Sequence, residues 1–134
     1  MLEKGPRRRI VVTGGAGFIG SHTAVALHEA GYAPVIVDDL RNSRKSAIAG
    51  IEALLKVPVE WHKVDCGDAQ DMKPVFDQPV HGAIHFAADK AVGESAASPE
   101  KYFDNNVGGT ARFTAQLRNH GVKHLSLIHI SEPT

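Results

Sequence analysis

The stretch Ile10-Val-Val-Thr-Gly-Gly-Ala-Gly-Phe-Ile-Gly-Ser-His-Thr23 decides the fold of this chain. Three apolar residues lead into the spaced glycines Gly14, Gly17 and Gly20, and a helical pattern then runs to Ala30. Strand, glycine turn and helix in this order open a dinucleotide-binding βαβ unit. We expect Gly14 to allow the turn, Gly17 to admit a pyrophosphate, and Gly20 to let the helix pack on the sheet. The unpaired N–H groups at the helix N-terminus then face the phosphates.

Strands continue to appear at regular intervals along the rest of the chain. Apolar runs bounded by turn residues predict four more of them, over 34–38, 57–64, 83–87 and 122–130. The run at 34–38 shows no polar alternation, which is typical of a parallel strand covered on both faces.

Helices are predicted between these strands. One covers 45–56, and its expected buried face consists of Ile48, Ile51, Leu54 and Leu55. A long helix starts at Ser98-Pro99-Glu100 and ends before Gly121, with a face made of Phe103, Val107, Ala111, Thr114 and Leu117. A short helix is capped by Asp68 or Asp71, and Pro74 must lie in its first turn or break it. The alternation predicts an α/β fold, a Rossmann-type doubly wound parallel sheet of about five strands in the order 3-2-1-4-5.

Composition and charge exclude several classes of function. Fifteen basic residues balance fifteen acidic ones in 134 residues, so we expect no nucleic-acid partner. The one local excess, Arg7-Arg8-Arg9, is interpreted as a solvated leader. No apolar run reaches the roughly 20 residues that span a bilayer, so no membrane partner is expected. Cys66 is the single cysteine, which favours a reducing, cytoplasmic setting and packing rather than thiol chemistry.

Asp38 ends the predicted second strand, where this fold places an acidic group that hydrogen-bonds the adenosine ribose. A carboxylate there repels a 2′-phosphate, so NAD is favoured over NADP. Arg41, Arg44 and Lys45 follow closely and keep NADP open as an alternative. The eight histidines are scattered over separate elements, and His120 and His124 lack carboxylate or cysteine partners at ligand spacing, so no metal site is expected.

Three blocks of sequence point to a known family. They are Thr13-Gly-Gly-Ala-Gly-Phe-Ile-Gly-Ser-His-Thr23, Ile84-His-Phe-Ala-Ala-Asp-Lys-Ala-Val-Gly-Glu-Ser95 and Tyr102-Phe-Asp-Asn-Asn-Val-Gly-Gly-Thr110. With them the chain resembles the extended short-chain dehydrogenase/reductase superfamily, and within it the UDP-glucose 4-epimerase family. The likeness covers about residues 9 to 125, and the middle block discriminates best among related nucleotide-sugar enzymes.

The resemblance implies a role for particular residues around NAD. The backbone N–H groups of Phe18 and Ile19 contact the pyrophosphate. The adenosine ribose is surrounded by Asp38, Asp39, Leu40, Arg41, Asn42 and Ser43. Asp65 and Cys66 flank the adenine. The nicotinamide side is lined by Phe86, Ala87, Ala88, Asp89 and Lys90, and Asn105 meets the cofactor from the long helix. Lys90 also lies near the UDP-sugar substrate, whereas Asp89 departs from the apolar residue that is commoner in the family.

The chemistry of the resembled family also needs a Tyr-x-x-x-Lys pair, which removes the proton of the sugar 4-hydroxyl while hydride moves to NAD. Neither tyrosine fits, because Ile36 lies four residues after Tyr32 and Asn106 lies four after Tyr102. The serine-rich strand end expected after Leu125 is also absent. No catalytic residue is therefore assigned within the chain, and we expect it to be inactive by itself.

The last nine residues, 126–134, resemble translated sequencing-adaptor read-through rather than the family. We therefore expect a charged leader over 1–8, a partial NAD-binding domain over 9–125 and an artefactual tail, with no substrate domain. On this hypothesis the chain is the start of a truncated gene. The resemblance also implies a homodimer at full length, with the helix over 99–120 in the contact.

Two other functions remain open. The first is the N-terminal part of a different nucleotide-sugar dehydratase or reductase, which shares the same scaffold. The second is a non-catalytic dinucleotide-binding sensor, in which the absence of the Tyr-x-x-x-Lys pair is genuine.

Overall fold

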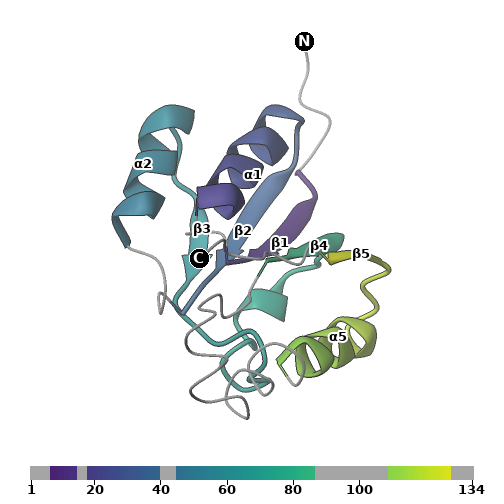
Figure 1. The fold of residues 1–134 in the computed structure, drawn as a ribbon. Coiled ribbons are helices and arrows are strands. Elements are labelled where there is room, and N and C mark those ends of the chain that lie inside the picture. The colour runs from purple at the N-terminus through teal and green to yellow at the C-terminus, as the bar shows by residue number, and fades with distance from the viewer. Residues whose placement is uncertain (1–6, 15–17, 40–44, 87–108, 128–134) are drawn as a thin grey trace.

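The computed structural model describes residues 7–14, 18–39, 45–86 and 109–127, which form a five-stranded parallel sheet flanked by helices (Figure 1). The strands are β1 (Arg9–Thr13), β2 (Ala33–Val37), β3 (Glu60–His62), β4 (Gly82–His85) and β5 (His124–Leu127). Their spatial order is β3-β2-β1-β4-β5 and every pair is parallel. The predicted fold class and strand order are confirmed.

Helices cover both faces of the sheet. In Figure 1, α1 (Phe18–Glu29) and α2 (Lys45–Leu55) lie on one side, and α5 (Gly109–Asn119) lies on the other. Two buried clusters correspond to these two layers. Ile36 packs under α1 and α2 with Ala24, Ile48, Ile51 and Val59. The cluster on the α5 side consists of Val11, Val35, Val37, Cys66, Met72, Val75, Ala83, Phe113 and Leu117.

The apolar strands and two glycines explain why these elements form. All five residues of β1 and the last four of β2 are buried, as expected of central strands with helices on both faces. Gly31 follows α1 with a φ of 100°, and Gly121 follows α5 with a φ of 73°. A glycine in this left-handed conformation is a common helix stop because it carries no Cβ. Both helices therefore end close to where the sequence predicts.

The helix faces were only partly predicted. Ile48 and Ile51 of α2 are buried as expected, but the side chain of Leu54 is 73% exposed, so its assignment to the buried face is wrong. In α5, Ala111 is exposed and Phe113 is fully buried, which also contradicts the predicted face. The large Phe113 ring sets the rotation of α5, because it fills the core beneath the sheet. Residues 99–108 of the predicted long helix lie outside the described residues.

The segment between α2 and β4 also differs from expectation. β3 is limited to Glu60–His62, which pair with Val35–Val37 of β2, and Val57 and Pro58 before it are exposed. Turns and the 3-10 helix η1 (Val75–Asp77) replace the predicted short helix. Asp68 accepts the backbone N–H groups of Gln70 and Asp71 at 3.0 and 3.2 Å, and Pro74 immediately precedes η1.

Arg9 is the clearest correction to the predicted leader. It begins β1, and only 8% of the residue is exposed. Its guanidinium contacts Glu60 through Nε–Oε1 and Nη2–Oε2 distances of 3.2 and 2.6 Å. Nη1 also donates to the carbonyls of Val75, Gln78 and Pro79 at 2.9, 2.7 and 3.3 Å. A charge that is paired and hydrogen-bonded can be buried, so this arginine joins β1, β3 and the η1 segment.

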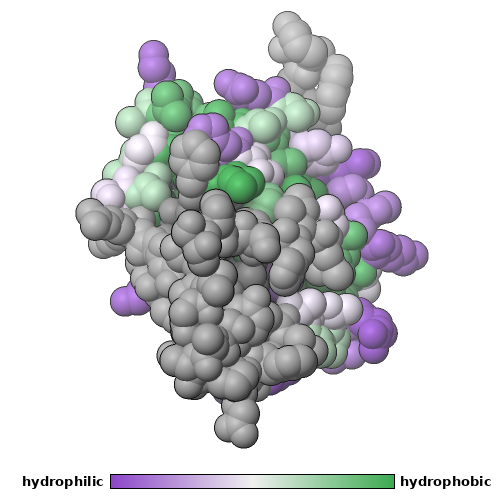
Figure 2. Space-filling view, in the orientation of Figure 1, coloured by the Kyte–Doolittle hydropathy of each residue, from purple (hydrophilic) through white to green (hydrophobic). Residues whose placement is uncertain are grey.

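Apolar residues are not confined to the interior. Figure 2 shows them gathered mainly over the α1 and α2 side of the visible face, with hydrophilic residues along the right-hand edge. The large apolar residues that remain exposed in the described part of the chain are Ile19, Leu54, Val57 and Leu125.

Candidate cofactor site at the carboxyl edge of the sheet

Three strands bring the predicted site residues to one edge of the sheet. Gly14 follows β1, Asp38 follows β2 and Phe86 follows β4. The backbone links them, because Gly14 N–H donates to the Val37 carbonyl at 2.8 Å and Phe86 N–H donates to the Thr13 carbonyl at 3.1 Å. In open α/β sheets, ligands bind in the crevice outside the carboxyl ends of the strands.

Gly14 has a tighter requirement than a turn alone. Its φ is 72°, in the left-handed region, and an added Cβ would lie 3.2 Å from the Phe86 Cβ. The backbone at Gly14 therefore passes close to Phe86 at the end of β4, and a side chain at Gly14 would press against it.

The described part of α1 begins where the sequence predicts a phosphate-binding helix N-terminus. The helix begins at Phe18, shortly after the turn, with Ile19 exposed and Gly20 buried in its first turn. The free N–H groups of a helix N-terminus attract anions. The burial of Gly20 agrees with the predicted close packing of helix on sheet.

Asp38 and Asp39 lie where β2 leaves the sheet. The backbone N–H of Asp38 donates to the His62 carbonyl at 3.1 Å, which continues the pairing with β3 beyond the strand end. Asp38 is buried and Asp39 is half-buried. Both residues therefore lie at the carboxyl edge of the sheet, and their role on the adenosine side remains a prediction.

Asp65 and Cys66 follow β3, next along the same edge. Asp65 Oδ1 accepts the Gly67 N–H at 2.9 Å, and the Cys66 carbonyl accepts Gln116 Nε2 at 2.8 Å. Burial, with the nearby Asp65 and Asp39 carboxylates, raises the pKa of the Cys66 thiol to about 12. A thiol with this pKa stays protonated near neutrality, so Cys66 acts as a small core side chain.

Sequence reasoning missed a buried polar chain behind the site. Thr13 Oγ1 lies 2.6 Å from His85 Nδ1, and His85 Nε2 lies 2.9 Å from Thr110 Oγ1. The Phe86 N–H also donates to Thr13 Oγ1 at 3.0 Å. This Thr13–His85–Thr110 relay joins β1, β4 and α5. Its one sequence signal is a histidine within the otherwise apolar run 83–87.

His85 is held neutral by its surroundings. Only 6% of the residue is exposed, and the ring of Phe113 lies 5.2 Å away between centroids. Burial lowers the pKa of His85 to about 4. Its imidazole is therefore an uncharged hydrogen-bonding group at physiological pH.

Several predicted site residues lie outside the described residues. They are Gly17, Leu40, Arg41, Asn42, Ser43, Ala87, Ala88, Asp89, Lys90 and Asn105. Their assigned roles remain predictions.

Comparison with protein-family models shows to which family the chain belongs. The model of the NAD dependent epimerase/dehydratase family matches residues 10–131, which include all of the described strands except Arg9, the first residue of β1. The chain belongs to this family.

Known members of the NAD dependent epimerase/dehydratase family bear out the resemblance to the UDP-glucose 4-epimerases. The UDP-glucose 4-epimerase of Dictyostelium discoideum is 47% identical over 118 residues, which are 87% of this chain and 34% of that protein. The enzyme of Bifidobacterium longum, solved in complex with NAD+ and UDP, aligns with a TM-score of 0.84 at 38% identity over 89% of this chain and 36% of its own. The enzyme of Stenotrophomonas maltophila, solved with bound NAD and formylated UDP-arabinopyranose, gives a TM-score of 0.85 at 35% identity over 90% and 36%. The chain spans about a third of the length of these relatives.

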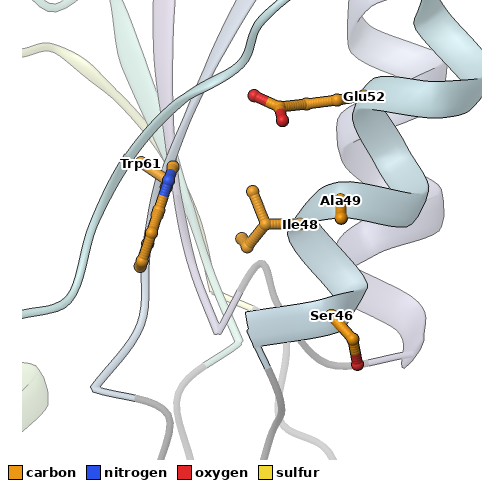
Figure 3. A pocket seen from close by; sticks show the side chains of 5 residues that line it. All are labelled: Ser46, Ile48, Ala49, Glu52 and Trp61. Atoms are coloured by element: carbon orange, nitrogen blue, oxygen red, sulfur yellow. The ribbon is translucent and has the colours of Figure 1, made fainter.

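This family member also has an open hollow between α2 and the edge strand β3, with a volume of about 330 Å³. It is lined by Ser46, Ile48, Ala49, Glu52 and Trp61, and Figure 3 shows Ile48 and Glu52 reaching from α2 toward the indole of Trp61. The Glu52 carboxylate accepts the Val59 N–H at 2.8 Å, so it already serves the α2–β3 connection.

Neither a metal-ligand cluster nor a membrane-spanning helix occurs in the described parts of the chain. There, no group of three or more His, Cys, Asp or Glu side chains is arranged to hold a metal ion. None of the described helices is long and apolar enough to cross a membrane.

Proposed function

We propose that this chain is the NAD-binding part of a UDP-glucose 4-epimerase. The observation that carries the proposal is the contact of the Gly14 turn with Phe86 at the carboxyl edge, beside the start of α1. A glycine is favoured here because its φ of 72° strains any other residue and an added Cβ would crowd Phe86, and Gly14 lies at the sheet edge where such folds bind their ligands. Relatives with NAD in their solved structures, at 35 and 38% identity, support the assignment.

Different residues of the chain bind different parts of NAD. The glycine turn and the N–H groups of Phe18 and Ile19 hold the pyrophosphate, and Asp38 accepts the adenosine ribose hydroxyls. Asp65 and Cys66 border the adenine. Phe86 begins the nicotinamide wall, to which we assign Ala87 to Lys90 and Asn105. Bound NAD supplies a hydride acceptor, and these residues bind it, orient it and exclude water.

We propose that the complete enzyme interconverts UDP-glucose and UDP-galactose. The chain contains no Tyr-x-x-x-Lys pair, so we assign the proton transfer and the sugar pocket to residues outside these 134. Lys90 reaches the UDP-sugar. The complete enzyme is a homodimer, and the lone cysteine agrees with a cytoplasmic setting. The chain by itself binds cofactor without turnover.

The first test is calorimetric titration of the purified chain with NAD and with NADP. We expect NAD to bind at least about tenfold more tightly, because Asp38 repels the 2′-phosphate of NADP. Gly14→Ala is expected to abolish NAD binding. Gly50→Ala is the matched control, since this glycine lies within α2 and its added Cβ meets no atom within 4 Å. A folded chain that binds no NAD, or prefers NADP, contradicts the proposal.

A second test addresses the substrate. The chain extended to the length of its relatives is incubated with NAD and UDP-galactose, and the product is identified by NMR. UDP-glucose is the expected product. A 4-keto-6-deoxy sugar would instead support the dehydratase alternative, and NAD binding without any turnover would support the sensor.

A further inference from the structure

The Thr13–His85–Thr110 relay places one imidazole between two threonine hydroxyls. A neutral imidazole has one donor nitrogen and one acceptor nitrogen, so the two contacts cannot be equivalent. Thr13 Oγ1 already accepts the Phe86 N–H at 3.0 Å. Within the described residues, His85 Nδ1 is the one acceptor in reach of the Thr13 hydroxyl. The Thr13 O–H therefore donates to Nδ1, and the proton of the ring is on Nε2.

This tautomer gives the relay a direction. Phe86 N–H donates to Thr13, Thr13 donates to His85 Nδ1, and His85 Nε2–H donates to Thr110 at 2.9 Å. Thr13 directly precedes Gly14, and Thr110 lies in the first turn of α5. The relay thus connects Gly14, at the end of β1, with α5, which covers the face of the sheet opposite α1 and α2.

We propose that His85, as the neutral Nε2–H tautomer, is a positioning residue that fixes α5 to the glycine turn and so sets the affinity for NAD. This inference rests on the proposed NAD-binding function. The physical basis of the proposal is the close approach of Gly14 to Phe86, where an added Cβ would lie only 3.2 Å from the Phe86 Cβ. Gly14 therefore has little room to move relative to the end of β4. Without the His85–Thr110 hydrogen bond, α5 holds His85 and the neighbouring Phe86 less firmly at the end of β4. The NAD site is then less well ordered before NAD binds.

Two substitutions cut the same hydrogen bond from opposite sides. Thr110→Val removes the acceptor with almost no change in size. His85→Asn keeps an acceptor near the position of Nδ1 for Thr13 but does not reach Thr110. We expect each to weaken NAD binding about fivefold to tenfold, which corresponds to one net hydrogen bond. The double variant should lose less affinity than the sum of the two single losses, because both single variants remove the same His85–Thr110 hydrogen bond.

Matched controls separate positioning from simple packing. Thr114→Val makes the same chemical change one turn later in α5, where the hydroxyl donates to the Thr110 carbonyl of its own helix at 2.8 Å. We expect its NAD affinity to be unchanged. Thr110→Ser keeps a hydroxyl at the relay and should retain the affinity of the parent chain. If Thr110→Val and Thr114→Val lose affinity equally, or if Thr110→Ser is as weak as Thr110→Val, the positioning role is wrong.

The tautomer is tested separately by ¹⁵N NMR of the imidazole nitrogens in the chain without NAD. At pH 7 we expect Nε2 protonated and Nδ1 unprotonated in His85. An imidazolium or an Nδ1–H tautomer would contradict the proposed directions of the two hydrogen bonds of His85. If the parent chain shows the expected tautomer but binds no NAD, the proposed function fails. If it binds NAD and Thr110→Val binds equally well, the positioning role alone fails.

Discussion

At the scale of single residues, Gly14 is under the strongest constraint. Gly14→Ala places a Cβ at a φ of 72° and 3.2 Å from Phe86, so it suffers both backbone strain and a steric conflict. We expect the free energy of unfolding to fall by about 2–3 kcal/mol. Gly31→Ala is the comparison, since its φ is 100° but its Cβ meets nothing within 4 Å. It should cost about 1 kcal/mol, because only strain remains.

Urea unfolding of both variants measures this difference. Equal losses for the two glycines would show that the Phe86 contact adds nothing to the strain.

His85 predicts a specific dependence of stability on pH. Its pKa is about 4 in the folded chain and near its ordinary value of 6.5 in the unfolded chain. Between pH 6.5 and about 4, the His85 imidazole is protonated in the unfolded chain but stays neutral in the folded chain. The stabilisation is therefore complete above pH 6.5 and is lost as the pH falls toward 4, by at most about 1.4 kcal/mol per pH unit.

The measurement is the urea unfolding free energy of the parent chain and of His85→Asn at pH 7, 6 and 5. We expect the parent chain to lose more stability than the variant over this range. Every other ionisable group is common to both proteins, so the difference between the two profiles isolates His85. Parallel pH profiles would contradict the assigned burial of His85.

Single residues also show where sequence reasoning succeeds. Gly14 could be predicted because its neighbours within a few positions define the turn. The Thr13–His85–Thr110 relay could not, since its members come from three elements and meet only after the sheet has formed. Arg9 was misjudged for the same reason, because Glu60 and the carbonyls at 75–79 lie far away in sequence.

At the scale of elements, Arg9 holds β1 to β3 and η1. Arg9→Met keeps the apolar stem and removes the hydrogen bonds to Glu60 and to three carbonyls. Breaking a buried pair costs about 3–5 kcal/mol, but Glu60 is partly exposed, so we expect about 2–3 kcal/mol. Arg8→Met is the matched control, because Arg8 is the exposed neighbour. Urea unfolding should leave the control close to the parent chain.

The Arg9–Glu60 contact also predicts how the stability of the fold changes at acid pH. Burial acts to raise the pKa of Glu60, but the hydrogen bonds from Arg9 and His62 outweigh it and leave the pKa below 4.5. This pair therefore stabilises the fold above pH 4.5, and the contribution is lost as the pH falls through the lowered pKa. Arg9→Met should show a smaller loss of stability below pH 4.5 than the parent chain.

Element types were easier to predict than element faces. Spacing and caps located α1 and α2 to within a residue or two, because these signals are local. The rotation of α5 was wrong because the pattern favoured Ala111, whereas the volume of Phe113 decides which side enters the core. β3 ends earlier than predicted because its last residue, His62, pairs with Val37, the last residue of its neighbour β2.

At the scale of the whole molecule, NAD should stabilise the complete fold. A ligand that binds only the folded state adds about 2.7 kcal/mol when its free concentration is 100 times Kd. We expect the thermal midpoint to rise with the logarithm of NAD concentration and by less with NADP. Scanning calorimetry with a series of cofactor concentrations measures this. A midpoint that is insensitive to NAD would count against the site.

The overall topology could be predicted because few arrangements satisfy an alternating β–α chain. Right-handed crossovers and a parallel sheet leave few strand orders, the glycine motif favours 3-2-1-4-5 among them, and the structure adopts that order. The crevice at the carboxyl edge follows from that order alone.

The central position of β1 also governs how the chain assembles during synthesis. β1 pairs with β2 on one side and with β4 on the other, so its second edge stays open while the ribosome translates from Val37 to Gly82. At about 5–20 residues per second this takes seconds. During that time an apolar strand edge is exposed to other nascent chains. Slowly translated codons in this interval should therefore increase the demand for chaperones.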